Sequence, residues 1–147
     1  MSGDSILTVE RPLPVPTSVS KPFWEAAARK ELVFQFCRRS GRFQHFPRPI
    51  SMGSGKRDLE WRRVSGLGHV YAFTITERGP GPFRQVGRYV VATIELDEGV
   101  RIVSNVVNCD PAAVSVGMRV RLFWLSLSPE INYPLFEPDL DGMAGRV

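Results

Sequence analysis

The sequence predicts a mainly β fold with one helix near the N-terminus, and three observations support this prediction. From residue 59 onward, segments rich in β-branched and aromatic residues recur at regular spacing. Asp97, Glu98 and Gly99, between two such segments, are typical of a tight hairpin connection. The 147 residues are 43% hydrophobic, which suits one ordinary domain or a small module plus a small domain. About five short strands of this kind indicate a small barrel or sandwich.

The first part of the chain is predicted to hold an arm, a helix and a hairpin. Prolines alternate with apolar residues over 11–16, which favours polyproline II, so we expect residues 1–20 to be an extended arm. Ser20 is a candidate N-cap for a helix that runs from Phe23 to about Glu31 and is rich in helix-forming residues. The elements expected next are a strand over 32–36, a turn at Gly41, a strand over 43–46 and a loop over 47–58.

The remaining residues are predicted to form the barrel. The whole chain then divides into an arm (1–20), a helix plus hairpin module (21–58), and a barrel with a C-terminal tail (59–147). The five strands expected in the last part cover residues 59–66, 68–77, 88–96, 100–108 and 118–127.

The hairpin module has the spacing of a zinc-binding knuckle. Cys37, Ser40, Ser51 and Ser54 form two pairs, each with two residues between its members and with ten residues between the pairs. This spacing brings four side chains around one tetrahedral ion. A hydroxyl is a poor zinc ligand that rarely ionises, and only one of the four positions is a cysteine. We therefore expect no bound metal.

The segments along the chain resemble, in their order and spacing, the acyl-CoA-associated family of zinc-ribbon and OB-fold proteins, formerly known as domain-of-unknown-function family 35. The resemblance covers about Lys21 to Pro138, and the segments that carry it are FWEA (23–26), LVFQFC (32–37), GRFQ (41–44), FPRP (46–49), LEW (59–61), SG (65–66), GHVYAFT (68–74), VVATIEL (90–96), VGMRV (116–120) and PLFEP (134–138).

The resemblance implies a rubredoxin-like zinc ribbon followed by a five-stranded OB-fold barrel. Three of the four cysteines that the family carries in its ribbon are replaced here, by Ser40, Ser51 and Ser54. We expect the ribbon to keep its shape without metal because apolar residues hold it against the barrel. The residues expected to do so are Phe34, Phe36, Phe43, Phe46 and Ile50.

The resemblance also implies a function. Family members often act beside thiolases, lipid-transfer-type aldolases or hydratases on CoA thioesters, so we expect a non-catalytic accessory subunit in a hetero-oligomer with a thiolase-fold enzyme. No tightly bound cofactor is expected, although an acyl-CoA could be shared with the partner. The expected contacts to CoA phosphates or to the partner are Arg38, Arg39, Arg42 and Arg48. The expected partner interface is Phe83, Arg84, Arg88, Pro134 and Phe136.

The charge distribution leaves a second class of function open. Residues 29–63 carry ten Lys and Arg against three Asp and Glu, so their net charge of +7 exceeds the +4 of the whole chain. This excess indicates either an anionic partner or an arginine-rich solvated surface. OB-fold barrels also bind single-stranded nucleic acid through aromatic side chains, for which Tyr71, Phe73 and Tyr89 are the candidates.

No catalytic constellation is recognisable in the sequence. Cys109 has no adjacent base or cation, so a structural role is expected for it. The glycines and prolines of 79–82 do not form a phosphate loop, because proline lacks a backbone donor. The first ten residues carry acids and no apolar stretch typical of a secretory signal, and two cysteines are too few for a disulfide framework. A cytoplasmic protein without membrane contact is expected.

Overall fold

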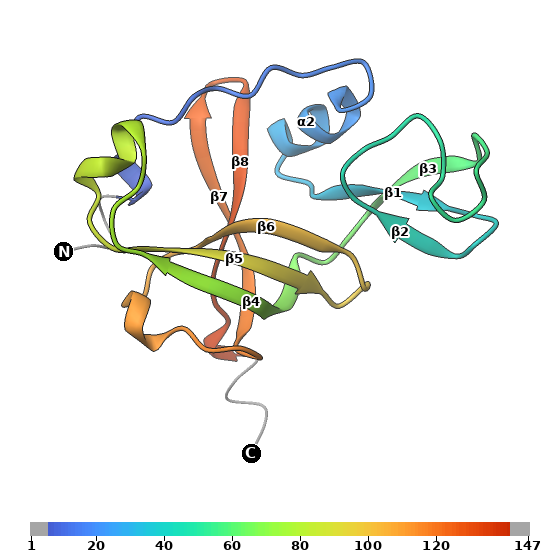
Figure 1. The fold of residues 1–147 in the computed structure, drawn as a ribbon. Coiled ribbons are helices and arrows are strands. Elements are labelled where there is room, and N and C mark those ends of the chain that lie inside the picture. The colour runs from blue at the N-terminus through green and yellow to red at the C-terminus, as the bar shows by residue number, and fades with distance from the viewer. Residues whose placement is uncertain (1–5, 142–147) are drawn as a thin grey trace.

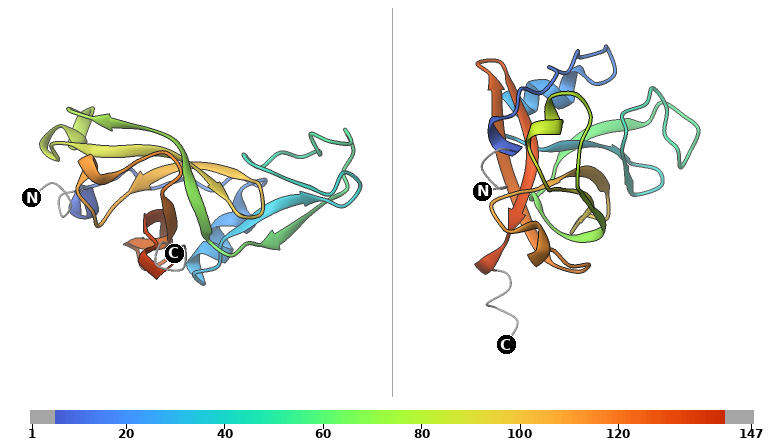
Figure 2. Two further views of the ribbon diagram at one scale, coloured as in Figure 1. Left: turned by 90° about the horizontal axis from the view of Figure 1, so that it is seen from below. Right: turned by 60° about the vertical axis from the view of Figure 1, so that its left-hand side comes forward.

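The computed structural model describes residues 6–141 and places a small three-stranded sheet beside a closed five-stranded barrel (Figure 1). Seen from below, the small sheet projects from one side of the barrel as a separate lobe (Figure 2). Helix α2 (Lys21–Ala28) lies between the two and contacts strands of both. Within residues 6–141, no helix has the length and apolar character needed to cross a membrane.

Helix α2 has the predicted N-cap residue, but it begins two residues before the predicted Phe23 and ends earlier than predicted. Ser20 is its N-cap residue, although the Ser20 hydroxyl accepts a hydrogen bond from the Thr17 backbone N–H at 2.9 Å rather than from the helix. Lys30 has a φ of 59°, a left-handed conformation that ends the helix before the predicted Glu31. Phe23 is buried and its ring meets the half-buried Trp24 edge-on at 5.0 Å, so the aromatic residues face inward as expected.

The small sheet, which we call the ribbon sheet, has the strand order β2-β1-β3. Its strands are β1 (Val33–Cys37), β2 (Arg42–Gln44) and β3 (Leu59–Arg63). The assignment of residues 59–63 to the barrel was wrong, because β3 pairs antiparallel with β1 along its whole length, from Cys37 opposite Leu59 to Val33 opposite Arg63. The half-buried Trp61 and Leu59 extend this sheet rather than the barrel.

The barrel closes in the order β4-β5-β6-β8-β7, with β7 pairing back to β4. Its strands are β4 (Leu67–Thr76), β5 (Tyr89–Leu96), β6 (Arg101–Val106), β7 (Arg119–Ser128) and β8 (Ile131–Pro138). The predicted number of strands is correct, but β8 was predicted as part of the tail. Prolines are rare inside central strands because they lack a backbone donor, and Pro134 lies within β8. The Ser104 hydroxyl donates to the Pro134 carbonyl at 2.7 Å.

Two apolar clusters hold the molecule together. The larger one fills the barrel and continues under the ribbon sheet through Phe34, Leu32 and Phe23. The smaller one lies outside the barrel, where residues 6–9 pack on Val107, Leu135 and the short 3-10 helix η1 (Gly81–Gln85). Residues 6–8 form part of a helix, so the start of the predicted extended arm is helical.

Candidate functional site

The four predicted ligand positions of the ribbon meet in the structure. Cys37 ends β1, the turn that follows presents Ser40, and the loop between β2 and β3 returns Ser51 and Ser54 to the same place. The backbone N–H of Ser40 donates to the Cys37 sulfur at 3.3 Å, and Cys37, Ser40 and Ser51 line one hollow. The Ser51 hydroxyl oxygen accepts from the backbone N–H groups of Gly53 and Ser54, at 3.0 and 3.1 Å.

Asp58 completes this cluster, which we call the Cys37 cluster (Cys37, Ser40, Ser51, Ser54 and Asp58). The Ser54 hydroxyl donates to Asp58 Oδ1 at 2.7 Å, and the Cys37 sulfur lies 3.6 Å from the same oxygen. Arg39 Nε lies 3.2 Å from Asp58 Oδ2. The hydrogen bond from the Ser54 hydroxyl is the main reason why the pKa of Asp58 lies below its ordinary value. Sequence reasoning missed Asp58, although its place four residues after Ser54 could have indicated it.

The thiol of Cys37 is unusually acidic. Hydrogen bonds from the hydroxyls of Ser40 and Ser51 are the largest causes that lower the pKa of Cys37 to about 7. Cys37 is 1% exposed, so its sulfur is shielded from solvent. A shielded sulfur favours a structural role for this ionisable group over a reactive one.

The residues of the Cys37 cluster do not fit a structural zinc ion. Such an ion takes four thiolate or imidazole ligands, whereas this cluster offers one thiol, one carboxylate and three hydroxyls. No group of three or more Cys, His, Asp or Glu with metal-binding geometry occurs within residues 6–141. The carboxylate of Asp58 instead accepts the hydrogen bonds that bring the cluster together.

A pair of glutamines holds the loop that follows β2. Gln35, on β1, is 5% exposed; its amide accepts from the Arg48 backbone N–H and donates to the Arg48 carbonyl, both at 2.8 Å. Gln44 donates to the Ile50 carbonyl at 3.2 Å and accepts from the Met52 backbone N–H at 2.8 Å. These bonds fix the loop backbone over residues 48–52. The expectation that Phe46 and Ile50 hold this loop was wrong, because their side chains are 67% and 45% exposed.

The positive charge of residues 29–63 is largely uncompensated. Each of the three acids in this range pairs with an arginine of the same range: Glu31 with Arg29, Asp58 with Arg39, and Glu60 with Arg62. Within the described part of the chain, no ion pair involves the other seven bases, which are Lys30, Arg38, Arg42, Arg48, Lys56, Arg57 and Arg63. The ribbon therefore presents a cationic surface that a carboxylate or phosphate could meet.

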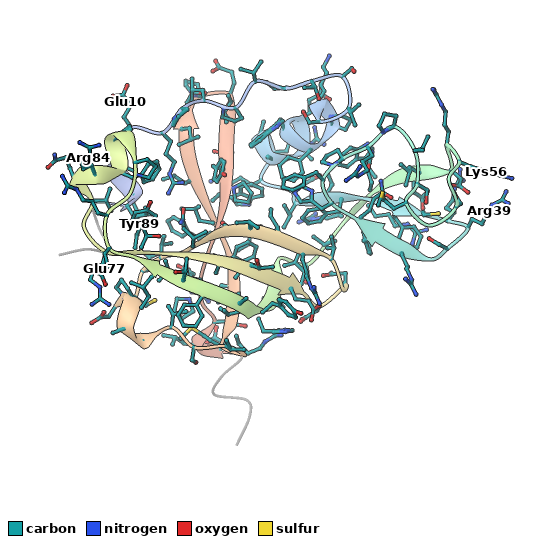
Figure 3. The ribbon with its side chains drawn as sticks, in the orientation of Figure 1. Glu10, Arg39, Lys56, Glu77, Arg84 and Tyr89 are labelled. Atoms are coloured by element: carbon teal, nitrogen blue, oxygen red, sulfur yellow. The ribbon has the colours of Figure 1, made fainter. Side chains whose placement is uncertain are left out.

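The arginines predicted to contact CoA or a partner all lie on this surface. Arg38, Arg39, Arg42 and Arg48 are exposed, and Arg39 is the one engaged by Asp58. Figure 3 shows Arg39 and Lys56 at the end of the ribbon that points away from the barrel. Arg84, from the second predicted set, lies at the opposite end of the molecule. The structure therefore does not bring the two predicted sets together.

The loop around Phe83 is packed rather than free. The Phe83 ring lies 5.5 Å from the Tyr89 ring, and the Arg11 guanidinium lies 5.3 Å from Phe83 and 5.5 Å from Tyr133. Arg11 also donates to Asn105 Oδ1 at 3.0 Å, which ties the N-terminal arm to β6. The prediction that Phe83 projects toward a partner does not agree with this half-buried position. Arg84 and Arg88 are exposed, and Arg88 pairs with Glu77 at 3.2 Å.

Two further predicted interface residues are buried. Phe136 has no exposed surface and belongs to the barrel core, and Pro134 beside it is buried as well. Their assignment to a partner interface was wrong, because the segment that contains them is the barrel strand β8 and not a tail. Pro134 only reaches the floor of a surface hollow.

The aromatic residues proposed for nucleic-acid stacking are not displayed together. Tyr89 is buried and Phe73 packs into the barrel core, whereas Tyr71 is 46% exposed. The Arg101 guanidinium covers the Tyr71 ring at 3.7 Å. Single-strand binding uses successive open aromatic faces, and these three residues supply at most one.

Two solved structures are similar to this fold. A chain of a structure described as "Ltp2-ChsH2(DUF35) aldolase" is 35% identical, with a TM-score of 0.76 over 86% of this chain and 98% of that chain. A DUF35-family protein of unknown function from Sulfolobus solfataricus is 13% identical, with a TM-score of 0.60 over 83% of this chain and 86% of that one. The second likeness shows the fold alone.

Curated sequences give a consistent result. A "Probable enoyl-CoA hydratase alpha subunit" of Thermomonospora curvata is 38% identical over 117 residues, which are 79% of this chain and 36% of that protein. A "DUF35 domain-containing scaffold protein" of Methanothermobacter thermautotrophicus is 32% identical over 51% of this chain and 56% of that protein. The chain thus spans about a third to just over half of these relatives.

The family assignment follows from these matches. A family model for the "ChsH2, C-terminal OB-fold domain" matches residues 61–125, which cover β4 to β6 and most of β7. The likeness to the DUF35 chain of the aldolase structure extends over nearly all of that chain. This chain therefore belongs to the DUF35 family of OB-fold proteins, as its resemblance predicted.

Proposed function

We propose that this chain is a non-catalytic accessory subunit of a thiolase-fold enzyme that acts on CoA thioesters in the cytoplasm. One observation carries the proposal: the chain matches 98% of the DUF35 chain of a structure described as an aldolase of Ltp2 with ChsH2, at 35% identity and a TM-score of 0.76. The part of that complex to which this chain corresponds is the DUF35 part. A role beside a catalytic subunit is the simplest one for such a chain.

The names of the relatives support both the accessory role and the CoA-thioester substrate class. Scaffold proteins of Methanothermobacter thermautotrophicus and Methanocaldococcus jannaschii match this chain at 32% and 40% identity, and their names describe support rather than catalysis. The two hydratase alpha subunits are named for CoA-linked substrates, and this chain corresponds to 36% and 37% of their lengths. CoA thioesters are therefore the substrate class that we assign to the complex.

We also propose that acyl-CoA is shared between this chain and its partner rather than held by this chain alone. The cationic surface of the ribbon supports this role, because its seven bases without an ion pair suit the phosphates of CoA. Arg38, Arg42 and Arg48 are the candidates whose side chains are exposed and not engaged in an ion pair of the described residues.

Co-expression with a thiolase-fold protein of the same organism tests the proposal. We expect tagged chain to recover that protein in near-equal amounts, and the purified complex to bind CoA more tightly than either subunit does. Recovery of the chain as a monomer in the presence of that protein would contradict the proposal. Binding of labelled single-stranded oligonucleotide that weakens steeply with salt would favour the nucleic-acid function instead.

A further inference from the structure

Two neighbouring hollows lie on the side of the barrel next to the ribbon sheet. The first, of about 180 Å³, lies between helix α2, the loop at 45–47, β6 and β8; its lining includes Phe23, Trp24, Phe46, Val103 and Tyr133. The second lies on the outer face of β4, β5 and β6, and Val103 lines it as well. Figure 1 shows these three strands side by side, with α2 beyond β6 and the ribbon sheet to one side. Val103 lines both hollows, so they adjoin at this residue, and we call the two together the Val103 trough.

The strand register explains why the outer face of the sheet is hollow. Ala72 on β4 lies opposite Thr93 on β5, and Thr93 lies opposite Val103 on β6. The next row of this face pairs Thr74 with Val91. All five side chains are small, so the middle of the face stands lower than its ends.

Bulky side chains form walls at both ends of the trough. At one end, Arg101 stacks on the exposed Tyr71 ring, with 3.7 Å between the guanidinium carbon and the ring centroid. At the other end, Arg11 bonds to Asn105, the residue next but one after Val103 on β6, and lies against Phe83. The N-terminal arm is therefore tied to β6 beyond one end of the trough, at a residue that lines neither hollow.

The trough carries apolar side chains that the described part of the chain leaves exposed. Val103 is 55% exposed and Phe46, at the ribbon end, is 67% exposed. Contiguous exposed apolar surface beside a polar rim is typical of protein interaction sites, whereas isolated exposed apolar residues need no explanation. Here the two residues border one depression, and the surface between them is also apolar.

We propose that the Val103 trough is the surface on which the partner subunit docks, and that its occupant is an apolar segment of the thiolase-fold subunit with carboxylates beside it. This inference rests on the proposed function and names the face that the complex uses. The trough accepts the apolar segment, and Arg48, at the ribbon end of the trough, accepts a carboxylate. Arg48, which follows the lining residue Pro47, is the nearest of the ribbon bases in sequence and is exposed.

Charge complementarity favours such a partner over a second copy of this chain. The carboxylate beside the trough is Glu95, and it already pairs with Arg101 at 3.1 Å and lies 3.3 Å from His69. All three acids within residues 29–63 are likewise paired within that range. The ribbon of a second copy would therefore bring more bases and only paired carboxylates, whereas a partner with an acidic rim would neutralise the bases.

A charge placed in the trough tests the inference. We expect Val103→Glu to weaken the complex with the thiolase-fold subunit by about tenfold or more, because binding would bury an unpaired carboxylate. Val116→Glu is the matched control, since Val116 is a 68% exposed valine that lines neither hollow. Ala72→Glu is a second variant at the floor of the trough, in case Val103→Glu does not fold. Affinity is measured by titration of purified subunits, and the fold of each variant is checked by thermal unfolding.

The possible outcomes separate this inference from the proposed function. If the wild-type chain forms the complex and both folded trough variants bind as tightly as Val116→Glu, the inference is wrong and the proposed function stands. If the wild-type chain forms no complex, both are wrong. If the wild-type chain is a homodimer that Val103→Glu dissociates, the trough is a self-interface and the inference is also wrong. Selective loss of binding in both trough variants supports it.

Discussion

The barrel and the ribbon sheet of this molecule are held together by different forces. The barrel core consists of fully buried apolar side chains such as Val70, Ile94 and Phe136, and its strands close on each other without a free edge. The ribbon instead buries Gln35 and Ser51, and its loop is fixed by hydrogen bonds to those side chains, to Gln44 and to Asp58. In other DUF35 proteins the resemblance implies a metal at this place; the contacts observed here are directional and polar.

This difference teaches how a small module with one cysteine at its four ribbon positions can be held in shape. Apolar contacts are non-directional, so a closed barrel unfolds as one cooperative unit. Hydrogen bonds in the ribbon each need a specific partner, so the loss of one acceptor leaves particular donors unsatisfied. We therefore expect changes in the barrel core to act on the whole molecule, and changes in the Cys37 cluster to act locally.

Restoring the metal site should have the largest effect. Because Ser40, Ser51 and Ser54 lie around Cys37, we expect the triple variant S40C/S51C/S54C to bind one zinc ion. Structural zinc sites supply about 10 kcal/mol or more of apparent binding free energy. Elemental analysis and competition with a chelator measure the effect, with the wild-type chain as the control. A triple variant that folds and binds no zinc would show that these positions do not form a ribbon site.

Truncation of a buried side chain in the barrel core should have the next largest effect. We expect Phe136→Ala to lower the free energy of unfolding by about 3–5 kcal/mol, because it removes a fully buried ring and leaves a cavity. Urea denaturation measures the loss. Val116→Ala, at a 68% exposed site, should change stability by no more than about 0.5 kcal/mol. Equal effects of the two variants would contradict the position of β8 in the barrel.

Removal of the acceptor in the Cys37 cluster should have a smaller and local effect. In Asp58→Ala the Ser54 hydroxyl and the Arg39 guanidinium lose their partner, so we expect faster amide exchange at 51–56. Amides of β5 and β6 should exchange as in the wild type. Asp58→Asn keeps an oxygen acceptor for Ser54 and should restore part of the protection. Unchanged exchange at 51–56 in Asp58→Ala would mean that Asp58 does not organise the loop.

A pH dependence is expected at the joint between ribbon and helix. The His45 ring lies 5.9 Å from Phe23 and 5.0 Å from Phe34, and burial lowers its pKa from 6.5 to about 4. As pH falls from 6.5 toward 4, the unfolded chain takes up the proton first, so His45 should lower stability over this range. Urea midpoints in wild type and His45→Phe measure it. The variant should lose less stability on acidification, and an equal loss in both chains would contradict this.

Much of the barrel could be predicted from the sequence, because its strands follow local rules. Residues 89–96 alternate buried and half-buried positions as a half-buried strand should, and the predicted ranges of four strands nearly match the observed ones. Residues 59–63 were assigned to the wrong sheet because alternation shows that a segment is a strand but not which strand it pairs with. β8 was not predicted as a strand, because Pro134 and Pro138 are more typical of a turn or a tail.

The candidate sites were less predictable than the barrel strands, because most of them depend on contacts between residues that are far apart in the sequence. The positions of Cys37, Ser40, Ser51 and Ser54 follow from sequence spacing, so their convergence could be foreseen. The depression around Val103 depends on register across three strands and on the arm held by Arg11, which joins residues 94 positions apart. Long-range pairing of this kind leaves no local signal. Exposure at Phe46 and burial at Phe136 likewise follow from the tertiary fold rather than from residue type.

The central claim is that the ribbon and the adjoining trough are kept as a contact surface for a thiolase-fold subunit. Hydrogen–deuterium exchange of the chain alone and in its complex tests this claim most directly. We expect residues 45–48 and 101–105 to exchange more slowly in the complex, while β7 keeps the rate that it has in the free chain. Protection confined to other parts of the chain, with 45–48 and 101–105 unchanged, would contradict it.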